Sequence, residues 1–107
     1  MENKKSEYEL RHLRIQEIIR DPSISPGAKV VLWRLIEYRG GKNYSFPSQE
    51  TLAKEVAMST RMVRYHIKLL RSKKIIDTKR KTIINPKTNK PIKSNIYYLD
   101  YVLRKKA

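Results

Sequence analysis

The stretch SQETLAKEVAMSTRMVRYHIKLLRSKK, residues 48–74, decides the fold of this chain. Ser48 is placed to cap a short helix, and Ser59 is placed to cap a second one. The turn AMST lies between them, at residues 57–60. The buried side of the first helix is supplied by Leu52, Ala53 and Val56. The pattern therefore predicts two short helices that are joined by a turn of about three residues.

The second of these helices is amphipathic. Its inward stripe, at i, i+4 and i+7, consists of Val63, Ile67 and Leu70. Its basic face consists of Arg61, Arg64, Lys68 and Arg71, with Tyr65 beside them. The flank between the two, which we expect to pack on a neighbouring helix or a partner, consists of Met62, His66 and Leu69. A helix on a membrane surface would need its apolar stripe for lipid, whereas packing the two short helices together buries both stripes. The pair therefore reads as a helix-turn-helix.

The residues before this pair predict a further helix. Ser25 is placed to cap it, Pro26 suits its first position, and the apolar repeat runs from residue 28 to about residue 39, where Gly40 and Gly41 end it. We expect Trp33 to be a packing residue. The apolar positions of the repeat are Val31, Leu32, Leu35, Ile36 and Tyr38. Residues 40–47, GGKNYSFP, are expected to form a loop.

The N-terminal segment has a mixed pattern. Ile15, Ile18 and Ile19 suit a short helix, while Tyr8 and Leu10 alternate as in a strand. Its boundary stays open at this point.

The residues after the pair predict a β-hairpin. Two runs rich in Ile, Thr and Tyr, IIDTKRKTII and IKSNIYYL, flank the loop NPKTNKP at residues 85–91, and we expect the prolines to stay out of the strand pairing. The tail from residue 100 onward is either a last helical turn or an extended arm. The chain is thus predicted to be one α+β domain, residues 1–107, with flexible ends at 1–7 and 104–107, a helix-turn-helix at about 48–73 and a wing at about 75–99.

The charge of the chain is concentrated in its C-terminal half. The net charge is +15, and residues 58–107 hold 15 Lys and Arg against 2 Asp and Glu, whereas residues 1–57 hold 10 against 8. A field this uneven attracts a polyanion to one side of the molecule, and nucleic acid is the commonest such partner.

Composition also limits the class of protein. The chain has no cysteine, which excludes disulfides and zinc–thiolate sites, and its start does not resemble a signal peptide. Apolar runs such as VVLW are far shorter than the roughly 20 residues that span a bilayer. We therefore expect a cytoplasmic protein that does not bind membranes.

In a helix-turn-helix, the second helix presents its N-terminal part to the major groove. Arg61 and Arg64 are the best candidates to read bases, because a guanidinium can donate two hydrogen bonds to guanine. The hairpin would then hold phosphates or enter a minor groove. The remaining candidate DNA contacts are Ser48, Gln49, Ser59, Thr60, Tyr65, Lys68, Arg71, Lys79, Arg80, Lys81, Lys87, Thr88, Asn89, Lys90 and Lys93.

Three segments together resemble a known family. SPGAKVVLWRLIEY (residues 25–38), FPSQETLAKEVAMSTRMVRYHIKLLRSKKII (46–76) and SNIYYL (94–99) are similar to the winged helix-turn-helix domain of plasmid and phage replication initiators and of regulatory or relaxosome accessory proteins of mobile elements. The resemblance covers roughly residues 24–99. It implies a winged-helix fold that binds duplex DNA through Ser59, Thr60, Arg61, Arg64, Tyr65 and Lys68. The hairpin is longer and more basic than the resemblance predicts.

Other functions find less support in the residues. His12 and His66 lie in separate segments without ligand-spaced partners, and there is no paired-carboxylate motif or phosphate loop, so we expect neither an enzyme nor a bound metal or cofactor. RNA binding is an alternative, because Tyr97, Tyr98 and Tyr101 could stack on unpaired bases, although at least one of them should be core.

Within DNA binding, two roles stay open. One is an accessory factor at an origin of replication or conjugative transfer, with a replication protein or relaxase as partner; the other is a transcriptional repressor. Since one small module contacts few bases, we expect a homodimer or several copies on repeated sites.

Overall fold

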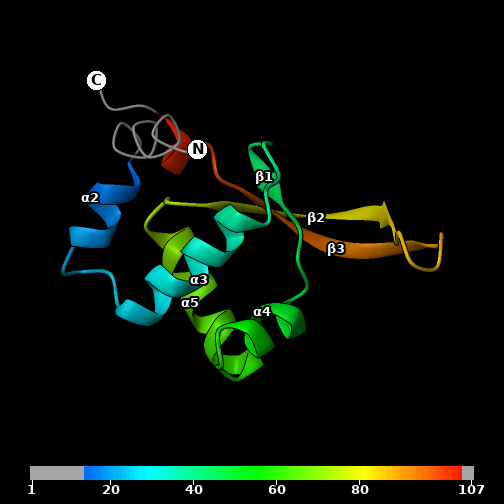
Figure 1. Cartoon of the computed structure of the whole chain (residues 1–107), viewed down its shortest axis with the longest axis horizontal. Helices are drawn as coiled ribbons and strands as arrows, with labels where there is room; N and C mark the ends of the chain where they lie inside the picture. Colours follow the sequence, from blue (N-terminus) through cyan, green and yellow to red (C-terminus); the bar gives the residue numbers. More distant parts are fainter. Residues whose placement is uncertain (1–13, 105–107) are drawn as a thin grey trace, which may run out of the picture.

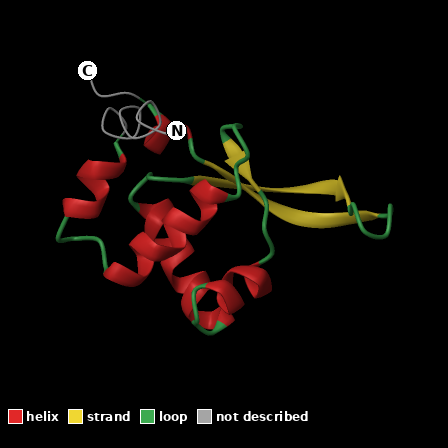
Figure 2. Ribbon diagram, viewed as in Figure 1, coloured by secondary structure: helices red, strands yellow, loops and turns green. Residues whose placement is uncertain are grey.

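The computed structural model describes residues 14–104. This part of the chain forms five helices and one three-stranded sheet, with the hairpin projecting from the helices (Figures 1 and 2). The predictions for Tyr8, Leu10 and His12, and for flexible ends at 1–7 and 105–107, lie outside the described residues. The elements are α2 (Ile15–Arg20), α3 (Pro26–Glu37), β1 (Tyr44–Ser45), α4 (Gln49–Glu55), α5 (Thr60–Ser72), β2 (Asp77–Ile84), β3 (Pro91–Tyr98) and α6 (Asp100–Leu103).

Three serines cap the three central helices, as predicted. The side-chain oxygens of Ser25, Ser48 and Ser59 accept hydrogen bonds from backbone N–H groups in the first turns of α3, α4 and α5. Pro26 occupies the first turn of α3. Each cap satisfies a backbone donor that has no partner within its helix, which fixes where that helix begins.

The core lies where α3, α4 and α5 meet. The predicted stripe of α5 is confirmed, because Val63, Ile67 and Leu70 are all buried. Leu35 of α3 and Leu52 of α4 are fully buried with them. Burial of each such leucine stabilises the fold by about 1.5–3 kcal/mol, so packing rather than intrinsic helix propensity holds these short helices.

α3 and α5 approach closely at one glycine. His66 of α5 is buried, and a Cβ atom placed on Gly27 would lie 2.5 Å from its Nε2 atom. The His66 Nδ1 atom lies 3.5 Å from the Ser25 hydroxyl. The expectation that His66 packs on a neighbouring helix is therefore confirmed: the missing side chain at Gly27 of α3 makes room for the imidazole ring.

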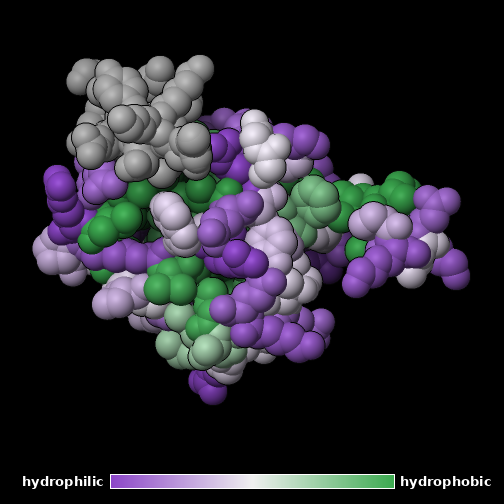
Figure 3. Space-filling view, viewed as in Figure 1, coloured by the Kyte–Doolittle hydropathy of each residue, from purple (hydrophilic) through white to green (hydrophobic). Residues whose placement is uncertain are grey.

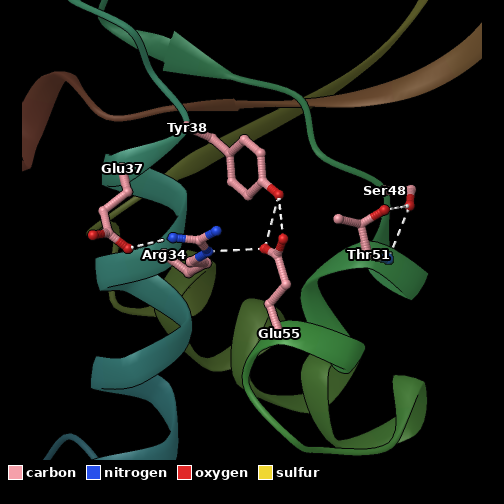
Figure 4. Close-up of polar contacts among 6 residues, drawn as sticks. All are labelled: Arg34, Glu37, Tyr38, Ser48, Thr51 and Glu55. Atoms are coloured by element: carbon pink, nitrogen blue, oxygen red, sulfur yellow. Dashed lines mark hydrogen bonds and ion pairs between the residues drawn. The ribbon is translucent and has the colours of Figure 1, made fainter. Parts of the chain in front are cut away.

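Polar contacts join the C-terminal end of α3 to α4 (Figure 4). Arg34 donates to Glu55 at 2.8 Å and to Glu37 at 2.8 Å, and the Tyr38 hydroxyl donates to Glu55. The guanidinium of Arg34 and then the Tyr38 hydroxyl hold the pKa of Glu55 below its ordinary value. The hydrogen bond to Glu55 raises the pKa of Tyr38. Tyr38 is therefore an exposed residue that joins α3 to α4 through Glu55, and not the core residue that the helical repeat predicts.

Two other apolar side chains are exposed, although the short helix that Ile15, Ile18 and Ile19 suit is present as α2. Trp33 is 41% exposed on α3, and Ile19 is 47% exposed on α2. Both lie on the sides of their helices that face away from the core, whereas Ile15 and Ile18 of α2 are buried. The prediction that Trp33 is a packing residue is wrong, because the core stripe of α3 is already completed by its aliphatic residues.

The sheet has the order β1–β3–β2, with antiparallel pairs throughout. β1 falls in the segment that we expected to be a loop; it has only two residues, too few for a strand pattern, and it exists because Tyr44 and Ser45 pair with Tyr98 and Tyr97. Three helices on a small antiparallel sheet with a projecting hairpin form an α+β winged helix-turn-helix, so the predicted fold class is confirmed.

The ends of the hairpin also differ in detail from the prediction. Ile75 and Ile76 do not belong to the strand, because Lys74 adopts a left-handed conformation after α5 and the two isoleucines that follow are buried in the core. Pro91 does pair, opposite Ile84, contrary to expectation. A proline is accepted there because it is the first residue of its strand.

Candidate nucleic-acid interface

The exposed face of α5 carries the basic residues that its helical spacing predicts. Arg61, Arg64, Lys68 and Arg71 are all exposed, and Tyr65 is 60% exposed between them. Within residues 14–104, none of these four cations forms an ion pair with a carboxylate. Their charge is therefore available to a bound anion.

Arg64 is held by the neighbouring helix. Its Nε atom donates to the side-chain oxygen of Gln49 at 3.2 Å, which connects the start of α4 to the exposed face of α5. Ser48, one residue earlier, contributes its hydroxyl to the helix cap and to Thr51. Because Gln49 orients the guanidinium through Nε, the two terminal nitrogens can point toward a base edge.

The turn between α4 and α5 is tight. Ala57 adopts a left-handed conformation with a φ of 55°, and the backbone N–H of Met58 donates to Ala53. Ser59 then begins α5 with its cap, so Ser59 and Thr60 lie at the N-terminal end of the helix, next to Arg61. This end of α5 carries a partial positive charge, which adds to that of the side chains.

The strand register divides the basic residues of the hairpin between two surfaces. Paired residues on neighbouring strands point to the same side of a sheet. The inner sheet surface, on the side of the buried Tyr97, consists of Arg80, Thr82, Lys93, Asn95 and Tyr97. The outer sheet surface consists of Tyr44, Phe46, Lys79, Lys81 and Tyr98. Lys79 and Lys81 therefore point away from Arg80 and Lys93, so these predicted DNA contacts of the hairpin do not share one surface.

A small cavity joins the inner sheet surface to α4. Its volume is about 190 Å³, and its lining includes Gln49, Arg80, Lys93 and Asn95. Tyr97 also lines it, with a buried hydroxyl that has no hydrogen bond of regular geometry among the described residues. Burial raises the pKa of Tyr97, so its hydroxyl is protonated and can donate. Gln49 thus borders both this cavity and the basic face of α5.

The hairpin tip is built by asparagines. Asn85 accepts the backbone N–H of Lys87 on its side chain, and Asn89 adopts a left-handed conformation with a φ of 58°. Asparagine tolerates that conformation better than most residues. Lys87, Thr88 and Lys90 are exposed at this tip, as are Ile84 and Ile92 at the adjoining strand ends. Hydrophobic and hydrophilic residues lie side by side along the projecting hairpin (Figure 3). Asn89 therefore shapes the backbone of the tip, whereas the sequence predicted only a contact with DNA for it.

Sequence reasoning missed two members of the inner sheet surface, Thr82 and Asn95. Successive side chains of a strand point to opposite sides of the sheet. If Tyr97 is the tyrosine in the core, residues 95 and 93 must therefore point to the same side as Tyr97. Tyr98, by contrast, points to the outer sheet surface with Lys79 and Lys81.

Within the described residues, no helix is long and apolar enough to cross a membrane. No curated protein matches the chain. A family model described as a helix-turn-helix domain matches residues 23–76, which include α3, α4 and α5 with their three serine caps. This match takes in half of the chain and the two helices whose geometry is described above, so the chain belongs to the helix-turn-helix domain family and carries a DNA-binding fold.

Proposed function

We propose that this protein binds double-stranded DNA at specific sites, with α5 in the major groove and the hairpin on the flanking backbone. The observation that carries the proposal is the exposed basic face of α5, whose four cations form no ion pair within residues 14–104. On this face Gln49 holds Arg64 by a hydrogen bond of 3.2 Å. A guanidinium fixed in this way can read guanine through two parallel hydrogen bonds. Arg61 is the second base reader.

The other contacts position the protein on the duplex. Tyr65, Lys68 and Arg71 lie farther along α5 and contact phosphate, as do Ser59 and Thr60 at its start. The inner sheet surface faces the same side as the helices, so Arg80 and Lys93 contact the backbone beside α4. Lys87, Thr88 and Lys90 extend the contact to the next groove.

The tip is suited to a minor groove. Lys87 and Lys90 lie at the tip between Ile84 and Ile92, which are exposed on opposite sides of the hairpin. Apolar side chains next to cations are the means by which many proteins kink a minor groove. An A·T-rich groove would be favoured, because its narrow width concentrates negative potential. The hairpin then contributes to specificity through groove shape.

The biological role that we propose is that of an accessory factor of a plasmid or other mobile element, acting at an origin of replication or conjugative transfer. The resemblance of the three segments at 25–38, 46–76 and 94–99 supports it. One module contacts few bases, so a homodimer or several copies on repeated sites would bind, together with a replication protein or relaxase. The alternative role is a transcriptional repressor.

Selection from random duplex DNA followed by footprinting tests the proposal. We expect an enriched motif whose half-sites lie about one helical turn apart, as the docking of paired recognition helices requires. If no motif is enriched, or if structured RNA displaces the duplex at equal concentration, sequence-specific binding to duplex DNA is wrong. A motif within a promoter would favour the repressor, whereas repeats at an origin would favour the accessory factor.

A further inference from the structure

The outer sheet surface exposes aromatic rings that the fold does not use for its core. Phe46 is 43% exposed, and Tyr44 and Tyr98 are half-buried. The tyrosine that packs against the helices is Tyr97, on the opposite side of β3. Three neighbouring rings on the solvent side of so small a sheet are therefore available to a ligand.

The three rings form a contiguous group. The ring centres of Tyr44 and Phe46 lie 6.4 Å apart with planes at 23°, and those of Tyr44 and Tyr98 lie 6.2 Å apart. Tyr44 and Tyr98 are held in this relation by the pairing of β1 with β3. The short strand β1 thus brings the aromatic residues of two distant segments together.

Lysines surround these rings. The Nζ atom of Lys42 lies 5.5 Å from the centre of the Tyr44 ring, and those of Lys79 and Lys81 lie 5.9 and 6.0 Å from the centre of the Tyr98 ring. Asp77 is the one carboxylate at the strand positions of this side, and it forms no ion pair with these lysines within the described residues. The surface is therefore both aromatic and cationic.

This combination identifies the class of ligand. A second copy of this chain, with its own charge of +15, would bring lysine against lysine. A single-stranded nucleic acid offers phosphates to the lysines and unpaired bases to the rings, which is how proteins hold single strands without reading their sequence. Duplex DNA offers only the phosphates, because its bases are stacked on one another.

We propose that the outer sheet surface binds single-stranded DNA, with bases stacked on Phe46, Tyr44 and Tyr98 and phosphates on Lys42, Lys79 and Lys81. We assign DNA rather than RNA because the opposite side of the same fold carries the DNA-binding helix, so that a strand separated beside that helix reaches this surface at high local concentration. The binding surface is distinct from α5, and its failure would leave the proposed duplex site untouched.

Fluorescence anisotropy with a labelled oligothymidylate of about 12 nucleotides tests this assignment in the full chain. Phe46→Leu keeps an apolar side chain and removes the ring, so we expect its Kd for the oligonucleotide to rise about 5- to 150-fold, the loss expected for one stacked base. Tyr98→Leu should act in the same direction. Affinity for duplex DNA should be unchanged in both variants.

Arg64→Ala is the matched control, with the opposite expected result: weaker duplex binding and an unchanged Kd for oligothymidylate. Ring resonances of Phe46 and Tyr44 that shift on addition of the oligonucleotide would place the strand on this surface. Absence of oligothymidylate binding, displacement of the oligonucleotide by duplex, or equal binding by wild type and by both folded ring variants would overturn the proposal. Tighter binding of oligouridylate than of oligothymidylate would overturn the assignment to DNA.

Discussion

α5 and the hairpin carry similar basic charge but are held in different ways. α5 buries Val63, His66, Ile67 and Leu70 against the rest of the fold, whereas the buried residues of β2 and β3 are confined to Ile96 and Tyr97. A helix whose rotation is fixed by its core stripe can aim a side chain at one base edge. A hairpin that is mostly exposed can follow the backbone of its ligand, so it is suited to phosphate contacts and groove shape.

The largest expected effect tests how firmly α5 is held. Leu70→Ala should lower the free energy of unfolding by about 2–5 kcal/mol, because it leaves a cavity at a fully buried position. Urea denaturation measures this change. Ile84→Ala, at a 58% exposed site on the hairpin, is the comparison and should alter stability by less than about 0.5 kcal/mol. Equal losses for the two variants would contradict the proposed difference between helix and hairpin.

The second prediction concerns base reading. Arg64→Ala should weaken binding to the selected site by about 1–3 kcal/mol relative to random duplex, because the guanidinium held by Gln49 is proposed to read a guanine. Titrations of both duplexes at one salt concentration measure the difference. Gln49→Ala, which frees the guanidinium, should reduce discrimination in the same direction but less. An equal loss on both duplexes for Arg64→Ala would make it a phosphate contact.

The third prediction concerns the hairpin. The double substitution Lys87→Ala with Lys90→Ala should weaken binding to both duplexes alike and reduce the slope of log K against log salt by about 1–2, since each phosphate contact contributes about 0.9. Binding isotherms recorded at salt concentrations from about 50 to about 200 mM measure this slope. The pair Lys79→Ala with Lys81→Ala, on the outer sheet surface, is the control with an expected smaller change. A larger change in slope for the Lys79 and Lys81 variant than for the Lys87 and Lys90 variant would mean that the outer sheet surface faces the duplex.

The smallest expected effect concerns Glu55, which joins α3 to α4. Its folded-state pKa lies below its ordinary value of 4.5, so its ionised form adds stability that is present above pH 4.5 and is lost as the pH falls through the folded pKa. Glu55→Gln should therefore be less stable than wild type at pH 7. The urea midpoints of the two proteins should converge as the pH falls below the folded-state pKa of Glu55. A stability difference that does not depend on pH would assign the effect to packing.

The elements that depend on local chemistry could be predicted from the sequence. Ser25, Ser48 and Ser59 cap helices as their positions indicate, and the stripe of α5 follows from its spacing. β1 could not be predicted, because two residues make no periodic pattern and the strand exists only through its long-range pairing with β3. The exposure of Trp33 could not be predicted for a related reason. The spacing of apolar residues along α3 does not show which faces of the helix are covered by other elements.

For the candidate site, residue type and approximate place could be predicted, but orientation could not. Lys79, Arg80 and Lys81 look equivalent as a basic run, and only the strand register separates Arg80 from its two neighbours. The contact between Gln49 and Arg64 likewise depends on how α4 crosses α5, which neither helix specifies alone.

The close approach at Gly27 makes the orientation of α5 depend on a residue of α3 that is not part of the basic face. Any side chain there would meet the His66 ring, which lies on the inward side of the turn that carries Arg64 and Tyr65. A larger side chain at residue 27 of α3 would push against His66. It would therefore tilt α5 and change the direction in which its exposed side chains point. If α5 reads DNA as proposed, a substitution at residue 27 should alter DNA preference although this residue lies on α3, outside the basic face of α5.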